Sequence, residues 1–563
     1  MKIKNEIERM LKNALEKMEV EFQGSFNLEH PQDLKNGDWT TNLALQLAGK
    51  AGKNPREFAE QIRAQIEPNK NIEKIEVAGP GYLNFYLSKK FFGEELERNL
   101  AEPNFAQKKE KILLEHSSPN LFKPFHIGHM VNNSIGESLG RVFKFLGYEL
   151  KQISFPSDVG PGIAKTIWAL KEQGKKIETL TLQEIADAYV LGSAEYKKSD
   201  LVKNEVDKIN FEIYNKIESE NLDFYEKGKQ LSLEHFEEIT QKLGSEFSEM
   251  IFESQAEEVG KEIVKKNIPE IFQEVKNEDG TTSVIFEGKN YTNVFINSQG
   301  FGTYLTKDIG LLKIKKEKYP EVEKSFVITD VEQKQHFEMV KEAGEKIAEI
   351  SDFTEKSKYL QHGRMNFSGK VKISSRYGNV PLALDVIKKV QENILEKMAE
   401  RKFLHQEKEK ISEKIAIATL KYSILKVTSG KNISFDVEKD TNPQGNSAPY
   451  ILYSLVRAKS ILRKIDFSDE ARPLVKKGEV SNLERKMYFF EEILEEVLND
   501  FSPHHLANYL YDLAQEFNTF YAETKILDEE NEDFKYNLMV VKKYQEILEK
   551  GLELLGIKTV EKM

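Results

Sequence analysis

The sequence predicts a parallel α/β core flanked by a small α+β domain at the N-terminus and an all-α bundle at the C-terminus. Three observations support this fold class: a strand–turn–helix–strand succession starting near residue 112, a second alternation of strands and helices after residue 290, and purely helical periodicity beyond about residue 405. Because 563 residues exceed what one core can organise, about two to four domains are expected. We place their bounds at residues 1–95, 105–404 and 405–563.

The first 95 residues combine both kinds of pattern. An amphipathic helix opens the chain with "MKIKNEIERMLKNALEK", and a second helix is expected through residues 40–62, "TTNLALQLAGKAGKNPREFAEQI". Residues 72–87, "IEKIEVAGPGYLNFYL", have the character of a strand. These elements predict a small α+β unit.

The central region begins with the apolar run "ILLE" (112–115), which a Ser-Ser-Pro sequence ends, as expected of a buried strand. A helix with one apolar face follows, and "YELKQISF" resumes as a strand. Such a βαβ unit implies a Rossmann-like parallel sheet. Since "SFVITD" (325–330) continues the alternation, the charged, mostly helical residues from about 165 to 290 are predicted to be an insertion.

Helical periodicity alone marks the C-terminal region. Apolar residues step by four and three along three stretches: Ile411, Ile415, Ala418, Tyr422 and Leu425; Phe490, Leu494, Val497 and Phe501; Leu506, Leu510, Leu513, Phe517 and Phe520. Each stretch forms one face of a helix, so a helical bundle is expected.

The bulk composition restricts the class of protein but not its function. No run approaches the roughly 20 apolar residues that span a bilayer, and the charged N-terminus has no secretory signal. We therefore expect a cytoplasmic protein that does not insert into membranes. With no cysteine, disulfides and thiolate metal sites are excluded. The net charge of −11 means that any contact with nucleic acid needs local basic patches.

A pair of histidines, His126 and His129, stands where the first strand turns into its helix, with Gly128 between them. That point binds anions through backbone N–H groups and the helix dipole, and Lys123 adds a positive charge. A metal site would need a third ligand and usually an i, i+4 spacing. The simplest alternative is that one histidine caps the helix while the other packs. From these residues alone, all three interpretations remain open.

The flanking residues carry a family resemblance. "HSSPNLFKPFHIGHM" (116–130) closely resembles the HIGH motif region of class I aminoacyl-tRNA synthetases, and its Ser-Ser-Pro-Asn and Lys-Pro resemble the arginyl-tRNA synthetases. "FGTYLTKDIG", "EQKQHF" and "KISSRYGNV" are similar to that family's catalytic motifs, and "VAGPGYLNF" to its N-terminal domain. "GNSAPYILYSLVRAKSIL", "HHLANYLYDLAQEFNTFYAE" and "LLGIKTVEKM" resemble its helical anticodon-binding domain.

The resemblance implies an arginine pocket. It places Glu115 and Asp308 at the guanidinium, where two carboxylates would match a planar fork of five donors. It places Asn120, Tyr304 and Gln333 around the rest of the amino acid. Without the resemblance, Glu115 would be read as a surface residue at a strand end and Asp308 as a helix cap, because most lone acids are solvated.

The resemblance also implies an ATP site. The implied catalytic residues are Lys123, His126, His129, Lys372 and Arg376, and the implied ATP contacts are Gly128, Glu332, His362, Gly363 and Ser374. Adenylation depends on positioning and positive charge. "GKVKISSRYGN" resembles the KMSKS loop but has Ser375 in place of the second lysine, a loss that the family commonly combines with a lysine such as Lys123. Asp330 departs from the small residue usual in class I enzymes, and His336 is expected only to pack.

The C-terminal bundle is the implied tRNA contact. Tyr450, Tyr453, Arg457 and the terminal Met563 are the implied contacts to the anticodon, since aromatic rings stack on unpaired bases. The basic residues that follow are expected to bind phosphates: Lys459, Arg463 and Lys464. The alternative for the aromatic residues is that they only form the bundle core.

The implied function is arginine–tRNA ligation: ATP-dependent activation of L-arginine to an adenylate, which requires the tRNA, and transfer to the 3′ end of that tRNA, with release of AMP and pyrophosphate. ATP is expected to carry Mg²⁺, no structural metal is expected, and the protein is expected to be a monomer. A small nucleotidylyltransferase would lack the helical domain, and a regulatory relative would have lost the motif residues. Another class I synthetase would need a different pocket, usually with zinc-binding cysteines.

Overall fold

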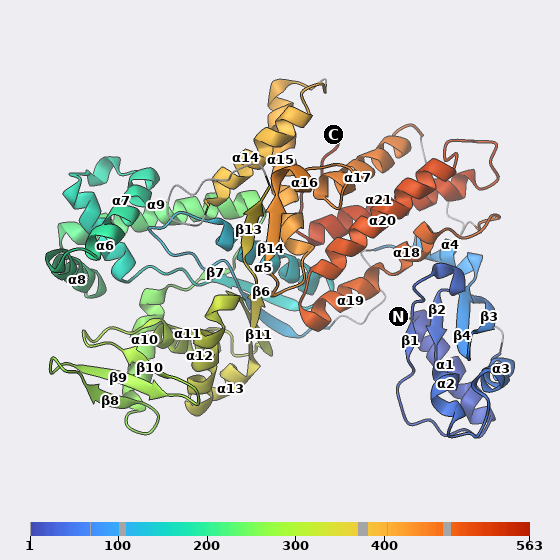
Figure 1. Ribbon diagram of the computed structural model, residues 1–563, viewed down its shortest axis with the longest axis horizontal. Coiled ribbons are helices and arrows are strands. Elements are labelled where there is room, and N and C mark those ends of the chain that lie inside the picture. The colour runs from blue at the N-terminus through green and yellow to red at the C-terminus, as the bar shows by residue number, and fades with distance from the viewer. Residues whose placement is uncertain (1, 68, 101–107, 370–380, 402, 466–474) are drawn as a thin grey trace.

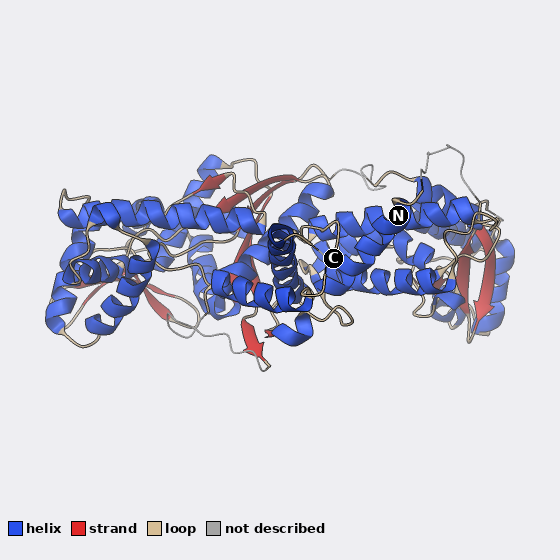
Figure 2. Ribbon diagram, turned by 90° about the horizontal axis from the view of Figure 1, so that it is seen from above, coloured by secondary structure: helices blue, strands red, loops and turns tan. Residues whose placement is uncertain are grey.

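The computed structural model describes residues 2–67, 69–100, 108–369, 381–401, 403–465 and 475–563. The molecule is elongated, with the N-terminal domain at one end, helices α6 (Pro161–Glu172), α7 (Leu182–Tyr196), α8 (Asp200–Tyr214) and α9 (Glu220–Leu243) at the other, and a five-stranded sheet between them (Figure 1). Most of its length is helical, and the strands lie in the middle, in the N-terminal domain and in a small separate sheet toward the opposite end (Figure 2).

The N-terminal domain is an α+β unit, as predicted. Its elements are α1 (Lys2–Lys17), β1 (Leu28–Glu29), η1 (Leu34–Asn36), β2 (Trp39–Thr41), α2 (Leu43–Ala48), α3 (Pro55–Gln65), β3 (Ile72–Ala78), β4 (Tyr82–Leu87) and α4 (Lys89–Glu97). The strands form an antiparallel sheet in the order β1-β2-β4-β3. The domain contacts the C-terminal helices, since His30 Nε2 lies 2.9 Å from the Glu492 carboxylate.

One local prediction in this domain is wrong. The helix expected over residues 40–62 is divided into α2 and α3, because Gly52 has a φ of 62°, Asn54 caps a new helix by accepting from the Arg56 N–H, and Pro55 begins it. The strand character predicted for residues 72–87 is confirmed: they form a hairpin of β3 and β4 that turns at Gly79 and Gly81, both of which have positive φ.

The central sheet is parallel, which confirms the predicted fold class. Its strands are β5 (Lys111–Glu115), β6 (Glu149–Ser154), β7 (Glu249–Met250), β11 (Lys324–Asp330) and β12 (Ser357–His362), in the order β12-β11-β5-β6-β7. Helix α5 (Ile127–Phe145) connects β5 to β6. The strand order reverses between β5 and β11, and ligands of open α/β sheets bind at the carboxyl ends of such strands.

The two faces of the sheet pack against different cores. Ile112 and Leu114 of β5 belong to a core that includes α5 and the C-terminal helices. Leu113, between them, belongs to a second core with α10 (Glu253–Lys266), α11 (Tyr304–Lys318) and α12 (Lys334–Lys346). Side chains alternate along a strand, so Glu115 lies on the α11 face.

Helix α11 lies in backbone contact with α10. A Cβ on Gly310 would come within 1.8 Å of the Ala256 carbonyl oxygen, and one on Gly260 within 2.0 Å of the Thr306 carbonyl oxygen. The remaining elements on this side are α13 (Ser351–Lys356), η3 (Val331–Gln333) and the antiparallel sheet of β8 (Gln273–Lys276), β9 (Thr282–Glu287) and β10 (Thr292–Ile296). The short helix η2 (Ile177–Thr179) belongs to the helices α6–α9. The close packing fixes where α11 presents its side chains to β5.

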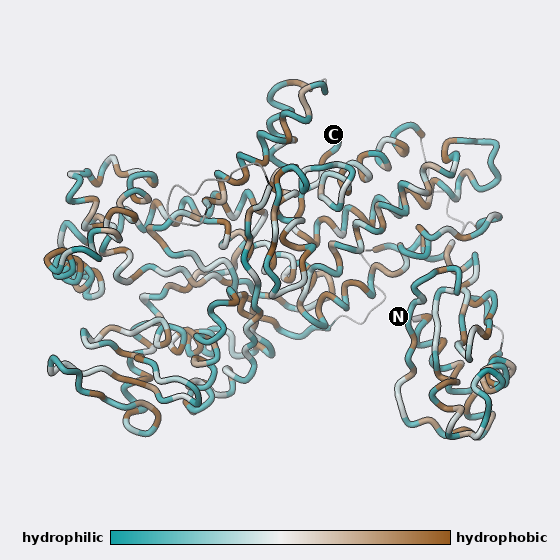
Figure 3. The backbone as a smooth tube through the Cα atoms, viewed as in Figure 1, coloured by the Kyte–Doolittle hydropathy of each residue, from teal (hydrophilic) through white to brown (hydrophobic). Residues whose placement is uncertain are grey.

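The C-terminal region is a helical bundle, as predicted. Its elements are α15 (His405–Leu425), α16 (Val437–Asp440), α17 (Ala448–Leu462), α18 (Asn482–Tyr488), α19 (Phe490–Asp500), α20 (His504–Glu523) and α21 (Phe534–Leu554). Before them, α14 (Ala383–Lys397) packs against α15, and β13 (Met365–Ser368) pairs with β14 (Ile433–Asp436). The three predicted stripes lie in α15, α19 and α20 and pack into the core shared with α5. Hydrophobic residues gather where the sheet meets the bundle (Figure 3).

Candidate active site

The two signature histidines cap the helix that follows them. His126 is the N-cap of α5 and its Nδ1 accepts from the Gly128 N–H at 3.1 Å, while His129 Nδ1 accepts from the His126 N–H at 3.3 Å. Their rings stack with centroids 3.8 Å apart. Because each Nδ1 accepts a backbone hydrogen, a neutral ring carries its proton on Nε2. Capping therefore leaves both Nε2–H groups as donors.

Both imidazoles are neutral at physiological pH. Burial and the charges of Lys123 and Arg364 lower the pKa of His126 to about 4. Burial and the neighbouring His126 lower the pKa of His129 well below its usual value. Lys123 is itself half-buried, with its ammonium 5.9 Å from the Tyr189 ring of α7, and burial lowers its pKa. The helix start thus provides two neutral donors beside one lysine.

Asn132 of α5 ties the ends of three strands together. Its Oδ1 accepts from the Ser117 N–H after β5 at 2.7 Å, and its Nδ2 donates to the Ile328 carbonyl of β11 at 2.7 Å. The same Nδ2 lies 3.3 Å from Nε2 of His362 at the end of β12. The helix start is therefore fixed against the crevice between β5 and β11.

The two acids predicted at the guanidinium lie in one cluster. Glu115, buried at the end of β5, pairs with the equally buried Lys315 of α11. Asp308, two turns earlier on α11, has its Oδ2 2.5 Å from His336 Nε2. Burial raises the pKa of Glu115, Lys315 opposes that rise and the charge of Asp308 adds to it. The carboxylates are close enough for their charges to interact.

The three other residues predicted around the amino acid have exposed side chains near this cluster. Asn120 pairs with Ser157 in a β-bridge, and Tyr304 opens α11 with its ring 5.0 Å from the Lys307 ammonium. Gln333 ends η3, where its Oε1 accepts from the Asp330 N–H at 3.2 Å. Lys307 is joined to Ser157 through Glu253, which bonds both.

The predicted ATP contact Glu332 is already paired within the protein. Arg364, after β12, donates from Nε to Asp330 Oδ2 at 2.9 Å and also pairs with Glu332. His362 is buried and its Nδ1 lies 2.9 Å from the Gly363 carbonyl oxygen. A Cβ on Gly363 would come within 2.1 Å of the Lys431 carbonyl oxygen, so close packing requires glycine there.

The predicted loop residues Lys372, Ser374 and Arg376 lie outside the described residues, as do Lys370 and Ser375. The chain after this loop is described, and it directly contacts the histidine pair segment at the start of α5. The Pro381 carbonyl accepts from the Ile127 N–H at 3.0 Å, and Leu382 pairs with His126 in a β-bridge.

The helices α6–α9 hold the segment that carries Lys123. Leu121 and Phe122 are buried in the core of these helices, and the Phe122 N–H donates to Ser232 Oγ of α9 at 3.1 Å. Phe122 has a φ of 62°. A Cβ on Gly228 would come within 2.3 Å of the Phe122 ring. The predicted insertion therefore supports the segment that carries Lys123.

In the reaction that the family resemblance implies, replacing Gly228 by alanine is expected to slow adenylate formation about 10-fold or more, because the methyl group displaces Phe122 and with it Lys123. Single-turnover adenylate formation in the presence of tRNA measures the effect. Gly49→Ala is the matched control, since a Cβ there meets nothing within 4 Å. Wild-type rates for Gly228→Ala would refute this role for α9.

A second cluster lies on the bundle and includes the predicted tRNA contacts. The Arg457 guanidinium lies 5.0 Å from the Tyr453 ring and 4.8 Å from the Tyr521 ring. Met563 lines the same surface pocket of about 820 Å³. Tyr450 is joined to Arg457 through Asn518, which bonds both side chains. The pocket is lined further by Arg401, Lys464 and Lys525.

Two basic residues expected to meet phosphates are engaged within the protein. Lys459 is buried and lies 2.6 Å from Glu549 and 2.5 Å from Glu561. Arg463 also pairs with Glu561. Their acidic partners come from α21 and the C-terminal segment, far along the chain, so the local sequence could not predict these ion pairs.

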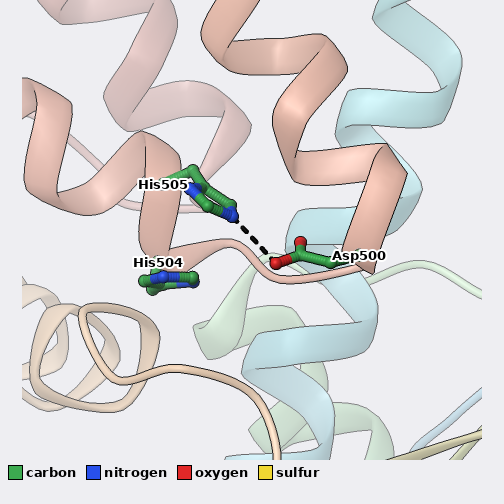
Figure 4. Close-up of side chains that lie close together, drawn as sticks. All are labelled: Asp500, His504 and His505. Carbon is green, nitrogen blue, oxygen red and sulfur yellow. Dashed lines mark hydrogen bonds and ion pairs between the residues drawn. The ribbon is translucent and has the colours of Figure 1, made fainter.

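Among the described residues, one group of three possible metal ligands lies close together: Asp500, His504 and His505 (Figure 4). His505 Nε2 is 2.9 Å from Asp500 Oδ2, and His504 Nδ1 is 2.6 Å from Ser502 Oγ. The group stands at the N-terminus of α20, where the helix dipole disfavours a cation. These features favour a surface hydrogen-bond cluster, and we assign no metal to it.

Sequence reasoning missed four residues of the two sites. Lys315 and His336 contact the acids, Asn132 joins the strand ends, and Tyr521 forms the second ring beside Arg457. The signal available in the sequence was weak: a lysine seven residues after Asp308 and an asparagine on the inner face of α5.

Within the described part of the chain, no helix has the length and apolar character needed to cross a bilayer. A family model for the catalytic domain of class I (R) tRNA synthetases matches residues 96–437, more than half of the chain. A model of the arginyl tRNA synthetase N terminal domain matches residues 5–87, and a DALR anticodon binding domain matches residues 451–563.

Relatives and solved structures resemble the chain along its whole length. The arginine–tRNA ligase of Fusobacterium nucleatum is 29% identical over 547 residues, covering 94% of this chain and 93% of that protein. That of Shewanella denitrificans is 26% identical over 596 residues, with both chains fully covered. The structure of Thermus thermophilus arginyl-tRNA synthetase, 22% identical, superposes with a TM-score of 0.78 and covers 99% of this chain and 100% of that one. The Plasmodium falciparum structure, 22% identical, gives 0.77, with 100% and 99% covered.

Proposed function

The chain belongs to the class I arginyl-tRNA synthetases, and we propose which of its residues perform each step of the arginine–tRNA ligase reaction. The observation that carries the assignment is the cluster of two acids, Glu115 and Asp308, beside the carboxyl ends of β5 and β11. Carboxylates hold a guanidinium through charge-assisted, often bidentate hydrogen bonds. Asn120, Tyr304 and Gln333 surround the amino acid at the mouth of this pocket.

In the first step, the arginine carboxylate attacks the α-phosphorus of ATP and pyrophosphate leaves. The Nε2–H groups of His126 and His129 donate to phosphate oxygens, and Lys123, Lys372 and Arg376 offset the negative charge that develops. The nucleotide is held by Gly128, Glu332, His362, Gly363 and Ser374. Mg²⁺ enters with ATP as part of the substrate. The acids of the crevice, Asp330 and Glu332, are already paired with Arg364.

In the second step, a hydroxyl of the tRNA 3′-terminal ribose attacks the carbonyl of the adenylate, and AMP leaves. The pocket formed by Tyr453, Arg457 and Met563, with Tyr450 beside it, supplies stacking surfaces and positive charge for anticodon bases.

The finer organisation is part of this proposal. Residues 1–95 contact the tRNA elbow, residues 105–404 catalyse, with an insertion at about 165–290, and residues 405–563 bind the anticodon. The protein acts as a monomer in the cytoplasm.

Charging of unfractionated tRNA tests the function directly. With ATP, Mg²⁺ and each labelled amino acid in turn, the protein is expected to attach arginine alone to tRNA. Attachment of a different amino acid, or of none, would refute the proposal.

Arg457→Ala is expected to raise the KM for tRNA while leaving the KM for arginine unchanged.

A further inference from the structure

The arginine pocket holds two basic groups of its own. The Lys315 side chain is 2% exposed and pairs with Glu115, whose side chain is 7% exposed. His336 of α12 reaches across to α11, with its Nε2 2.5 Å from Asp308 Oδ2. Each of the two acids predicted to bind arginine therefore already has one basic partner within the protein.

The charges in the cluster leave a place for a single cation. Glu115 and Asp308 contribute two negative charges, and Lys315 contributes one positive charge. Glu253 of α10 is balanced by Lys307, at 2.6 Å. With His336 neutral, the pocket has a net charge of −1 and matches one guanidinium. With His336 protonated, it has no net charge.

The hydrogen bond also determines which oxygen remains available. His336 Nε2–H donates to Asp308 Oδ2, so Oδ1 is the oxygen left for a ligand. A bidentate grip on a guanidinium needs an acceptor whose orientation is fixed, and the imidazole provides that orientation.

On the basis of the proposed function, we infer that Lys315 and His336 are positioning residues for arginine: Lys315 keeps Glu115 ionised, and His336 orients Asp308 and gives up a proton when the guanidinium binds. Neither residue belongs to the reacting centre. The arginine selectivity of the pocket thus depends on a resident lysine and on a histidine that changes its charge.

The sign of the proton linkage follows from the charges around His336. Burial lowers its pKa, but the hydrogen bond and charge of Asp308, and then the charge of Glu253, outweigh burial and raise the pKa above its usual value. Among the described residues, the other titratable groups of the cluster are the Glu115–Lys315 pair, Lys307 beside Glu253, and Tyr359 of β12. A guanidinium beside Asp308 cancels the stabilising charge, so the imidazolium releases its proton. Arginine affinity therefore rises with pH until His336 is neutral in the free protein.

Calorimetric titration of the full chain with arginine, from about pH 6 to 8 in buffers of different ionisation heat, counts the released protons. The wild type is expected to release up to one proton, with a Kd that falls by as much as about tenfold per pH unit on the acid side. His336→Gln keeps a side-chain N–H donor but cannot titrate, so binding persists without proton release. His405→Gln, an exposed histidine at the start of α15, is the control and behaves as wild type.

Lys315 is tested in the same titration. Lys315→Met leaves Glu115 buried without a cation, so Glu115 is protonated in the free protein and arginine binding releases an additional proton. Lys315→Arg restores wild-type stoichiometry. Wild-type proton release in His336→Gln, or in Lys315→Met, would overturn the corresponding assignment. No binding of arginine to the wild type at any pH would instead overturn the proposed function, and this inference with it.

Discussion

Replacing Asp308 by asparagine is expected to raise the KM for arginine about 100-fold or more while leaving the KM for ATP nearly unchanged. A charge-assisted hydrogen bond contributes roughly 1.5–3 kcal/mol, and removing one partner of a buried charge pair costs about 2–5 kcal/mol. The effect of replacing Asp308 is easier to interpret than that of replacing Glu115. The partner of Asp308, His336, can lose its proton, so no unpaired charge remains buried. Glu115→Gln would leave the buried Lys315 unpaired.

Steady-state kinetics with arginine varied at saturating ATP and tRNA measures this effect. Asp352→Asn is the matched control, because Asp352 is exposed and pairs with Lys316, which is also on α11. A change of less than about threefold in the KM for arginine would show that Asp308 does not contact the substrate, since the loss would fall below one hydrogen bond.

Lys123→Ala is expected to slow adenylate formation about 100-fold or more, and far more than Lys370→Ala does. Positive charge aimed at a developing anion in a partly buried site is among the largest catalytic contributions. Lys123 is half-buried, and its charge lowers the pKa of His126, which places it beside the start of α5, the proposed phosphate-binding point. The loop that includes Lys370 has a serine where a second lysine is usual in related loops.

Rapid-quench measurement of adenylate in the presence of tRNA separates this step from transfer. Lys165→Ala is the matched control, because Lys165 also lies over a tyrosine of α7, at 3.9 Å from the Tyr196 ring, and it is expected to change the rate little. Equal effects of Lys123→Ala and Lys370→Ala would show that Lys123 does not replace the missing loop lysine.

The parallel core was predictable because its signals are local. The apolar run of β5, the Ser-Ser-Pro sequence after it and the single apolar face of α5 lie within about 35 residues, and each independently favours the same βαβ unit. The helix over residues 40–62 was predicted wrongly because helical periodicity continued through Asn54 and Pro55, which begin a new helix. At Asn54 and Pro55, the signal for a new helix N-terminus is stronger evidence than the helical spacing of apolar residues that continues through them.

The two acids assigned to the proposed arginine pocket came from the family resemblance, whereas their partners were missed. Lys315 meets Glu115 only because β5 and α11, 200 residues apart, pack face to face. His336 was expected only to pack, yet it bonds to Asp308. Tyr521 reaches Arg457 from a different helix. Contacts of this kind depend on tertiary packing, and no spacing within one segment encodes them.

Exchange of labelled pyrophosphate into ATP tests the central claim most directly, because it reports selection and activation of the amino acid at once. With arginine and its tRNA, the protein is expected to catalyse exchange, with little when the tRNA is omitted and none when lysine replaces arginine. No exchange with arginine and tRNA present, or equal exchange with lysine, would contradict a pocket in which two acids hold a planar cation beside the nucleotide.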